Sequence, residues 1–151
     1  MADIVTPEVR SRMMSGIRGR DTKPEMLLRR GLHAMGLRFR LQDRTLPGKP
    51  DLVFPRHRAA VFAHGCFWHG HDCPLFKMPS SRTEFWEAKI SGNRARDLLN
   101  LERLKSAGWR TLTVWECATR GPSRLPLEKV LEESREWILS DRPAVQIRGN
   151  D

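Results

Sequence analysis

The sequence has 151 residues, of which 39% are hydrophobic, and its formal charge is +9 with an isoelectric point of about 10.5. A chain of this length fits one domain, and its hydrophobic content excludes a disordered basic tail. The excess of Lys and Arg predicts a polyanionic partner such as DNA or RNA. A protein that is merely soluble and basic, a ribosomal protein and a membrane-surface protein are alternatives at this stage.

The sequence has no apolar run near the about 18 residues of a membrane span, and its N-terminus has no signal-type hydrophobic stretch. We therefore expect a cytoplasmic protein that does not associate with a membrane. In a reducing compartment, cysteines near histidines are more often metal ligands or catalytic groups than disulfides. Three cysteines also cannot all form pairs, so a metal site is the leading expectation.

Two helix starts lie near the N-terminus. Thr6 and Thr22 are each followed within three residues by a proline and a glutamate, which is typical of a capped first turn. The first predicted helix is rich in arginine and poor in apolar residues, so residues 1–20 are predicted to form a basic arm. The second carries apolar residues on one side and stops at Gly36, so it is predicted to pack in the core.

Short strand-like runs and two more helices follow. The strand-like runs, bounded by Pro, Gly or charged residues, cover 37–42, 51–54, 59–63 and 109–117. Helical spacing predicts a long helix over 83–107, which Gly108 ends, and a final helix over 125–139. This order favours a mixed central sheet flanked by helices, an α/β fold. Residues 21–139 are therefore predicted as one domain, and residues 140–151 as a flexible tail.

Residues 62–73, "FAHGCFWHGHDC", contain three of the five histidines and two of the three cysteines. Cys66, His71 and Cys73 have a C-x4-H-x-C spacing, and Cys117 ends a predicted strand. Structural zinc takes four sulfur or nitrogen ligands in a tetrahedron, so these residues predict a Zn²⁺ site that orders the loop. The alternative is that the two close cysteines are ordinary reduced thiols.

With His71 assigned to zinc, His64 and His69 remain on the same loop for chemistry. Asp51 opens a strand directly after Pro50 and should lie in the sheet next to the strand that delivers these histidines. A carboxylate suits Mg²⁺, and a neutral imidazole can take a proton from water near pH 7. Together they predict Mg²⁺-dependent phosphodiester hydrolysis. The alternatives are an aspartate in a solvated turn and histidines with purely structural hydrogen bonds.

Four stretches resemble the very-short-patch repair (Vsr) family of DNA mismatch endonucleases, in order between Arg10 and Arg120: "RTLPGKPDLVF", "FAHGCFWHGHDCPLFK", "RTEFWEAKISGN" and "GWRTLTVWECA". The resemblance implies a restriction-endonuclease-like core, a structural zinc, and Mg²⁺-dependent incision 5′ to the T of a T·G mismatch made by deamination of 5-methylcytosine. It also implies a bacterial, nucleoid-associated monomer whose partners are double-stranded DNA with that mismatch and mismatch-repair proteins.

The resemblance further implies roles for individual residues. The catalytic set would be the Mg²⁺-binding Asp51, the general base His69, His64 at the scissile phosphate, and Glu25, which supports the active-site histidine. The zinc ligands would be Cys66, His71, Cys73 and Cys117, in agreement with their spacing. The DNA contacts would be the aromatic wedges Phe67, Trp68 and Trp86, then Met14 from the other groove, and Lys89 and Asn93 near the mismatched pair.

This chain departs from the family pattern in several places. Ala63, whose backbone carbonyl would bind Mg²⁺, stands where the family commonly has Thr, and Gly70 and Asp72 interrupt a denser histidine run. The second half of the PD-(D/E)-x-K pattern is absent, so His69 would replace its lysine. A nickase that acts on fully paired DNA and a zinc-stabilised DNA-binding module without catalysis are the alternative functions.

Overall fold

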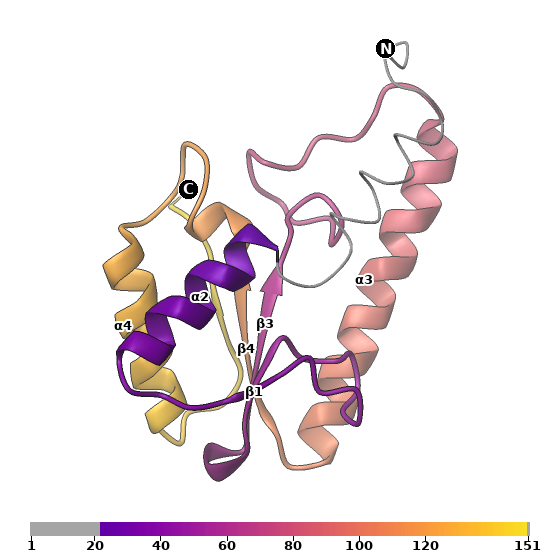
Figure 1. Cartoon of the computed structure of the whole chain (residues 1–151). Helices are drawn as coiled ribbons and strands as arrows, with labels where there is room; N and C mark the ends of the chain where they lie inside the picture. The colour runs from indigo at the N-terminus through magenta and orange to yellow at the C-terminus, as the bar shows by residue number, and fades with distance from the viewer. Residues whose placement is uncertain (1–21, 151) are drawn as a thin grey trace.

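The structure is a computed structural model, and it describes residues 22–150 (Figure 1). In chain order its elements are α2 (Lys23–Ala34), β1 (Arg40–Leu41), β2 (Leu52–Phe54), the 3-10 turn η1 (Pro55–His57), β3 (Ala59–His64), α3 (Thr83–Ser106), β4 (Arg110–Trp115), η2 (Glu116–Ala118), α4 (Leu127–Leu139) and β5 (Val145–Ile147). The predicted basic arm, with Met14, lies outside the described residues.

Five strands form one sheet in the order β1-β2-β3-β4-β5. β2 pairs antiparallel with both β1 and β3, whereas β4 pairs parallel with both β3 and β5. Parallel neighbours need a crossover connection, and α3 supplies it between β3 and β4. The prediction of a mixed sheet flanked by helices is confirmed.

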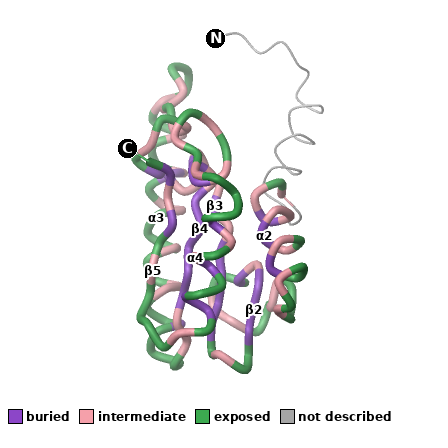
Figure 2. The backbone as a smooth tube through the Cα atoms, turned by 90° about the vertical axis from the view of Figure 1, so that its left-hand side faces the viewer, coloured by how far each residue is buried: buried purple, intermediate pink, exposed green. Residues whose placement is uncertain are grey.

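Helices cover both faces of this sheet. Figure 1 shows α2 and α4 on one side of β3 and β4, and α3 on the other. Nearly every residue of β3 and β4 is therefore buried, and the buried segments in Figure 2 follow these strands. Leu28 and Leu32 of α2 join Val130 and Trp137 of α4 in the main hydrophobic core. The central strands are thus held firmly, and their ends can position side chains.

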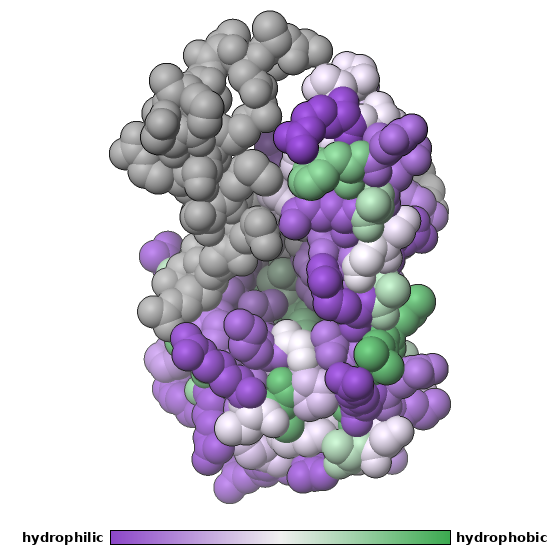
Figure 3. Space-filling view, turned by 90° about the vertical axis from the view of Figure 1, so that its right-hand side faces the viewer, coloured by the Kyte–Doolittle hydropathy of each residue, from purple (hydrophilic) through white to green (hydrophobic). Residues whose placement is uncertain are grey.

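Helix boundaries follow signals in the sequence. Pro24 lies in the first turn of α2, and Gly36 follows its end with φ +94°, which glycine adopts without a Cβ clash. Helix α3 buries only Ile90 and Leu104, and the face of the molecule that carries it is mainly hydrophilic, with separate hydrophobic patches (Figure 3). Within residues 22–150, no helix combines the length and apolar composition needed to cross a membrane.

The structure corrects the expectation of a flexible tail from residue 140 onward. Val145–Ile147 forms β5, which pairs with β4, and Ile147 is buried in the core. A three-residue strand is too short to show an alternating pattern, and its neighbouring strand specifies it more than its local sequence does. The C-terminal segment is therefore part of the folded domain.

Candidate active site and metal centre

A groove of about 1560 Å³ lies at the end of the sheet where β3 and β4 terminate. Because β2 runs antiparallel to β3, the residue before β2 lies beside the last residues of β3. Asp51, His64 and His69 line the same groove. The prediction that Asp51 lies next to the strand that delivers these histidines is confirmed, because Asp51 is hydrogen-bonded to Ala63 of β3. Basic side chains also line it, namely Lys23, Arg44, Lys49, Lys89, Arg96 and Arg120.

Two carboxyl groups meet on one side of the groove. Asp51 Oδ2 accepts a 2.7 Å hydrogen bond from the backbone N–H of Ala63. The buried Glu25 accepts from Gln42 Nε2 at 2.7 Å and from Arg29 at 3.2 Å. Burial raises the pKa of Asp51 to about 7, helped by the nearby Glu25 carboxyl and opposed by the bond from Ala63. A cation here would offset the penalty of ionising Asp51, so the donor set fits Mg²⁺.

His64 and His69 form a stacked pair whose ring centroids are 3.7 Å apart with planes inclined by 4°. Burial, with smaller contributions from the neighbouring histidines, holds the pKa of His64 well below its usual value, so this ring is neutral at pH 7. His69 Nδ1 lies 2.5 Å from Oδ2 of Asp97 on α3. This contact leaves Nε2 of His69 as the ring nitrogen that can accept a proton.

Partly buried aromatic side chains lie beside the histidine pair. Phe67, Trp68 and Trp86, here called the aromatic cluster, are in mutual contact with ring centroids 5.2 to 5.9 Å apart. Asn93 Nδ2 donates a 2.8 Å hydrogen bond to the backbone carbonyl of Trp68, which fixes the cluster against α3. Phe67 and Trp68 line the groove, where such rings can stack on bases or wedge between them.

One face of α3 supplies polar groups to the groove. Lys89, Asn93 and Asp97 recur every four residues and therefore lie on the same side of the helix, and all three line the groove. Sequence reasoning singled out Lys89 and Asn93 but missed Asp97. The four-residue spacing was the signal that could have found it.

Two further residues of the site were missed. Gln42 donates to Glu25, and the Trp115 ring stacks on His71 with centroids 3.9 Å apart. Neither residue has a local sequence signal, because each contact joins segments that are distant in the chain. Gln42 and Trp115 thus help to fix the positions of Glu25 and His71.

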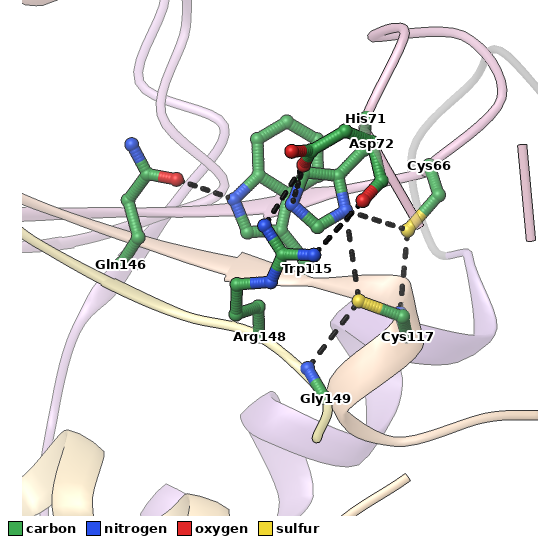
Figure 4. A network of polar contacts seen from close by, with 8 residues as sticks. All are labelled: Cys66, His71, Asp72, Trp115, Cys117, Gln146, Arg148 and Gly149. Carbon is green, nitrogen blue, oxygen red and sulfur yellow. Dashed lines mark hydrogen bonds and ion pairs between the residues drawn. The ribbon is translucent and has the colours of Figure 1, made fainter. Parts of the chain in front are cut away.

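The four predicted zinc ligands come together in one cluster. The ligand atoms of Cys66, His71, Cys73 and Cys117 all lie within 4.8 Å of one another, and Figure 4 shows three of these side chains converging. His71 Nδ1 is 3.6 Å from Sγ of both Cys66 and Cys117. Zinc–sulfur and zinc–nitrogen bonds at a tetrahedral angle place sulfur and nitrogen about 3.6 Å apart. The cluster therefore fits a tetrahedral metal ion.

Burial raises the pKa of the Cys66 and Cys117 thiols. Thiolates at these positions therefore need a compensating cation, which a divalent metal supplies. Backbone N–H groups add donors, since Cys117 N donates to Cys66 Sγ at 3.3 Å. These four residues could therefore hold a metal ion.

Comparison with known proteins gives one consistent result. The family model described as DNA mismatch endonuclease Vsr matches residues 2–75. The chain is 48% identical to the DNA mismatch endonuclease Vsr of Escherichia coli (strain K12) over 97% of this chain and 94% of that protein. It is 43% identical to the type II nicking enzyme V.XorIIP of Xanthomonas oryzae pv. oryzae over 89% of this chain and 100% of that protein. The type II nicking enzyme V.NmeAIP of Neisseria meningitidis serogroup A is 39% identical over 91% of this chain and 100% of that protein.

Proposed function

Because the chain belongs to the Vsr family of DNA mismatch endonucleases, we propose that it nicks DNA 5′ to the T of T·G mismatches that arise by deamination of 5-methylcytosine. The relatives named as endonucleases and nicking enzymes cover most of the chain, so it is a DNA endonuclease. We also propose that the protein has a restriction-endonuclease-like core. We further propose that it is a bacterial, nucleoid-associated monomer that interacts with mismatch-repair proteins.

The observation that carries this proposal is that one groove is lined by Asp51, the histidine pair, and Phe67 and Trp68 of the aromatic cluster. Its basic lining suits the phosphate backbone of DNA, which dominates affinity in such complexes. The aromatic cluster suits a wedge between base pairs. Unstacking requires a few kcal/mol per step and less at a mispaired base, so a wedge favours mismatched DNA.

Asp51 and the backbone carbonyl of Ala63 would hold the Mg²⁺ ion. The raised pKa of Asp51 supports this assignment, because burial, with a smaller contribution from the nearby Glu25 carboxyl, penalises ionisation of Asp51 and a bound cation would offset that penalty. When bound, Mg²⁺ supplies positive charge that offsets the charge developing on the phosphate oxygens. Glu25, for which the family resemblance implies a role in supporting the active-site histidine, accepts hydrogen bonds from Gln42 and Arg29 and lies next to the Asp51 carboxyl.

His69 acts as the general base in this proposal. Its Nδ1 is engaged by Asp97, so Nε2 accepts the proton of the attacking water as the water oxygen bonds to phosphorus. The leaving oxygen of the broken phosphodiester bond takes a proton from solvent. His64 stacks on His69 and is neutral, so it can hydrogen-bond the phosphate without repelling a protonated His69.

The Cys66, His71, Cys73 and Cys117 cluster would hold a structural zinc. With four protein ligands there is no position for water or substrate, so this ion would order the loop and take no part in hydrolysis. The loop between these ligands carries Phe67, Trp68 and His69. Zinc thereby supports both the wedge and the base.

End-labelled duplexes that differ only in one T·G or C·G pair test the function. With Mg²⁺ present, we expect nicking at T·G alone. Equal nicking of both duplexes would favour the second candidate, a nickase for fully paired DNA, which the type II nicking enzymes among the relatives support. Binding without nicking would contradict both and leave a zinc-stabilised DNA-binding module.

A further inference from the structure

Strand β5 and the two residues after it make three separate contacts with the surroundings of the Cys/His cluster. Gln146 Oε1 accepts a 2.8 Å hydrogen bond from Trp115 Nε1, and the Trp115 ring stacks on His71. Gly149 N donates to Cys117 Sγ at 3.3 Å. Figure 4 shows these contacts on one side of the cluster. The segment that ends the fold therefore touches two of the four ligands, directly or through one side chain.

The third contact is an ion pair between Arg148 and Asp72. Arg148 Nη1 donates to Asp72 Oδ1 at 2.8 Å, and its Nη2 donates to the backbone carbonyl of Asp72 at 2.9 Å. Asp72 Oδ1 lies 3.7 Å from Nε2 of His71, while Nδ1 of His71 faces the cysteine sulfurs. At 3.7 Å the approach of Asp72 to His71 is an electrostatic contact and not a hydrogen bond. A carboxylate near the outer nitrogen of a metal-bound histidine favours one orientation of the ring.

The extended backbone of β5 and of the residues directly after it explains how one short segment makes all of these contacts. Side chains alternate between the two faces of a strand, so Gln146 and Arg148 lie on the same face. Ile147, between them, is buried in the core on the opposite face. The core thus anchors the strand, while its other face is directed at the cluster.

Gly149 approaches the cluster more closely than any other residue type could. A Cβ at this position would lie 2.4 Å from the carbonyl oxygen of Cys117 and 2.6 Å from that of Ser123. Both are backbone atoms, which cannot move aside cheaply. The close approach is what brings the Gly149 N–H within reach of the Cys117 sulfur.

We propose that Gln146, Arg148 and Gly149, here called the C-terminal clasp, are positioning residues of the metal centre, with Asp72 as the carboxylate that orients His71. This inference rests on the proposed zinc centre and adds the elements that retain the ion. A centre with three thiolates and one zinc ion carries a net charge of about −1, so an N–H donor at Cys117 stabilises it. Arg148 keeps the exposed carboxylate of Asp72 beside His71.

The test is the rate at which purified full-length protein loses zinc to a chromophoric chelator, measured well below the unfolding temperature. Wild type should contain about one zinc per chain, which four protein ligands predict. Arg148→Ala and Gly149→Ala should release zinc about 10- to 100-fold faster, the usual effect of removing an outer-sphere partner. Asp72→Asn should also release zinc faster than wild type. Arg148→Lys should release zinc more slowly than Arg148→Ala, because it keeps the positive charge.

Two control variants separate positioning from general destabilisation. Ile147→Val loosens the core face of the same strand without touching the clasp, so the unfolding temperature should fall while zinc release stays at the wild-type rate. Arg142→Ala removes an exposed arginine just before β5 and should change neither the unfolding temperature nor the rate of zinc release. In Co²⁺-substituted protein, the thiolate-to-metal absorption band should move to longer wavelength in Gly149→Ala, because a thiolate that loses a hydrogen bond is a better electron donor.

The zinc measurements distinguish a failure of the proposed zinc centre from a failure of the C-terminal clasp alone. A wild-type protein that retains no zinc overturns the zinc centre and the clasp together. A wild-type protein with one zinc, in which Arg148→Ala, Asp72→Asn and Gly149→Ala all release it at the wild-type rate, overturns the clasp alone.

Discussion

His69 Nδ1 lies 2.5 Å from Asp97 Oδ2, and this contact joins the metal-binding loop to the middle of α3. A carboxylate accepts but does not donate, so it selects the tautomer of His69 in which Nδ1 carries the proton. The lone pair of the other nitrogen is then free for a water molecule. The pair has the form of a base and the residue that orients it.

We predict that Asp97→Asn slows nicking by about 10²-fold or more, because an amide can donate to Nδ1 and favour the wrong tautomer. DNA affinity at a fixed salt concentration should stay near wild type. Single-turnover nicking and equilibrium binding measure the two effects separately. Glu102→Gln removes an exposed carboxylate from the same helix and serves as the control; equal rates for wild type and Asp97→Asn would show that the pair does not support the base.

Asp51→Asn should abolish nicking while zinc content remains that of wild type. It should also change stability in a pH-dependent way when no Mg²⁺ is added. The folded-state pKa of Asp51 is raised from 3.8 to about 7, so the folded protein binds this proton more tightly than the unfolded chain. Wild-type stability relative to Asp51→Asn should therefore fall as pH rises from about 4 to about 7. Thermal melts across this range check the sign, and a constant difference would contradict it.

Trp68→Ala should narrow the difference in affinity between T·G and C·G duplexes, because the aromatic cluster acts on the deformed complex. Nicking should slow as a consequence of poorer positioning. Competition binding with the two duplexes at one salt concentration measures the effect. Trp109→Ala is a matched control, since Trp109 packs under Arg58 and does not line the groove. If Trp68→Ala discriminates between the T·G and C·G duplexes as well as wild type does, Phe67 or Trp86 must be the principal wedge.

Cys117→Ser should lower zinc content and the unfolding temperature together, since metal binding is coupled to folding. A loss of several kcal/mol corresponds to a fall of about 10 °C or more in a domain of this size. Elemental analysis and calorimetry on the same preparation provide the measurement. Normal zinc content in Cys117→Ser would remove this residue from the proposed ligand set.

The Cys/His cluster could be predicted because few residue types bind zinc and three of the ligands lie close together in sequence. The proximity of Asp51 and His64 was also predictable, because adjacent antiparallel strands place the start of one beside the end of the other. These features depend on short spacing and simple strand geometry.

Other parts of the fold needed the tertiary structure. Strand β5 forms by parallel pairing with the edge of β4. Its three residues are too few to show a strand-like alternation in the sequence. Leu98 fits the helical spacing of an apolar stripe on α3 but is 66% exposed, because α3 buries only Ile90 and Leu104. The partnership of Asp97 with His69 likewise depends on where α3 crosses the loop.

The most direct test of the central claim is single-turnover nicking of one T·G duplex with both strands labelled and the products mapped to the nucleotide. Wild type should cut the T strand 5′ to the T and leave both the G strand and a matched C·G duplex intact. His69→Ala should bind the T·G duplex with near wild-type affinity and nick it about 10²- to 10⁴-fold more slowly, the usual effect of losing a general base. Nicking by His69→Ala at the wild-type rate, or equal cleavage of the C·G duplex by wild type, would contradict the account.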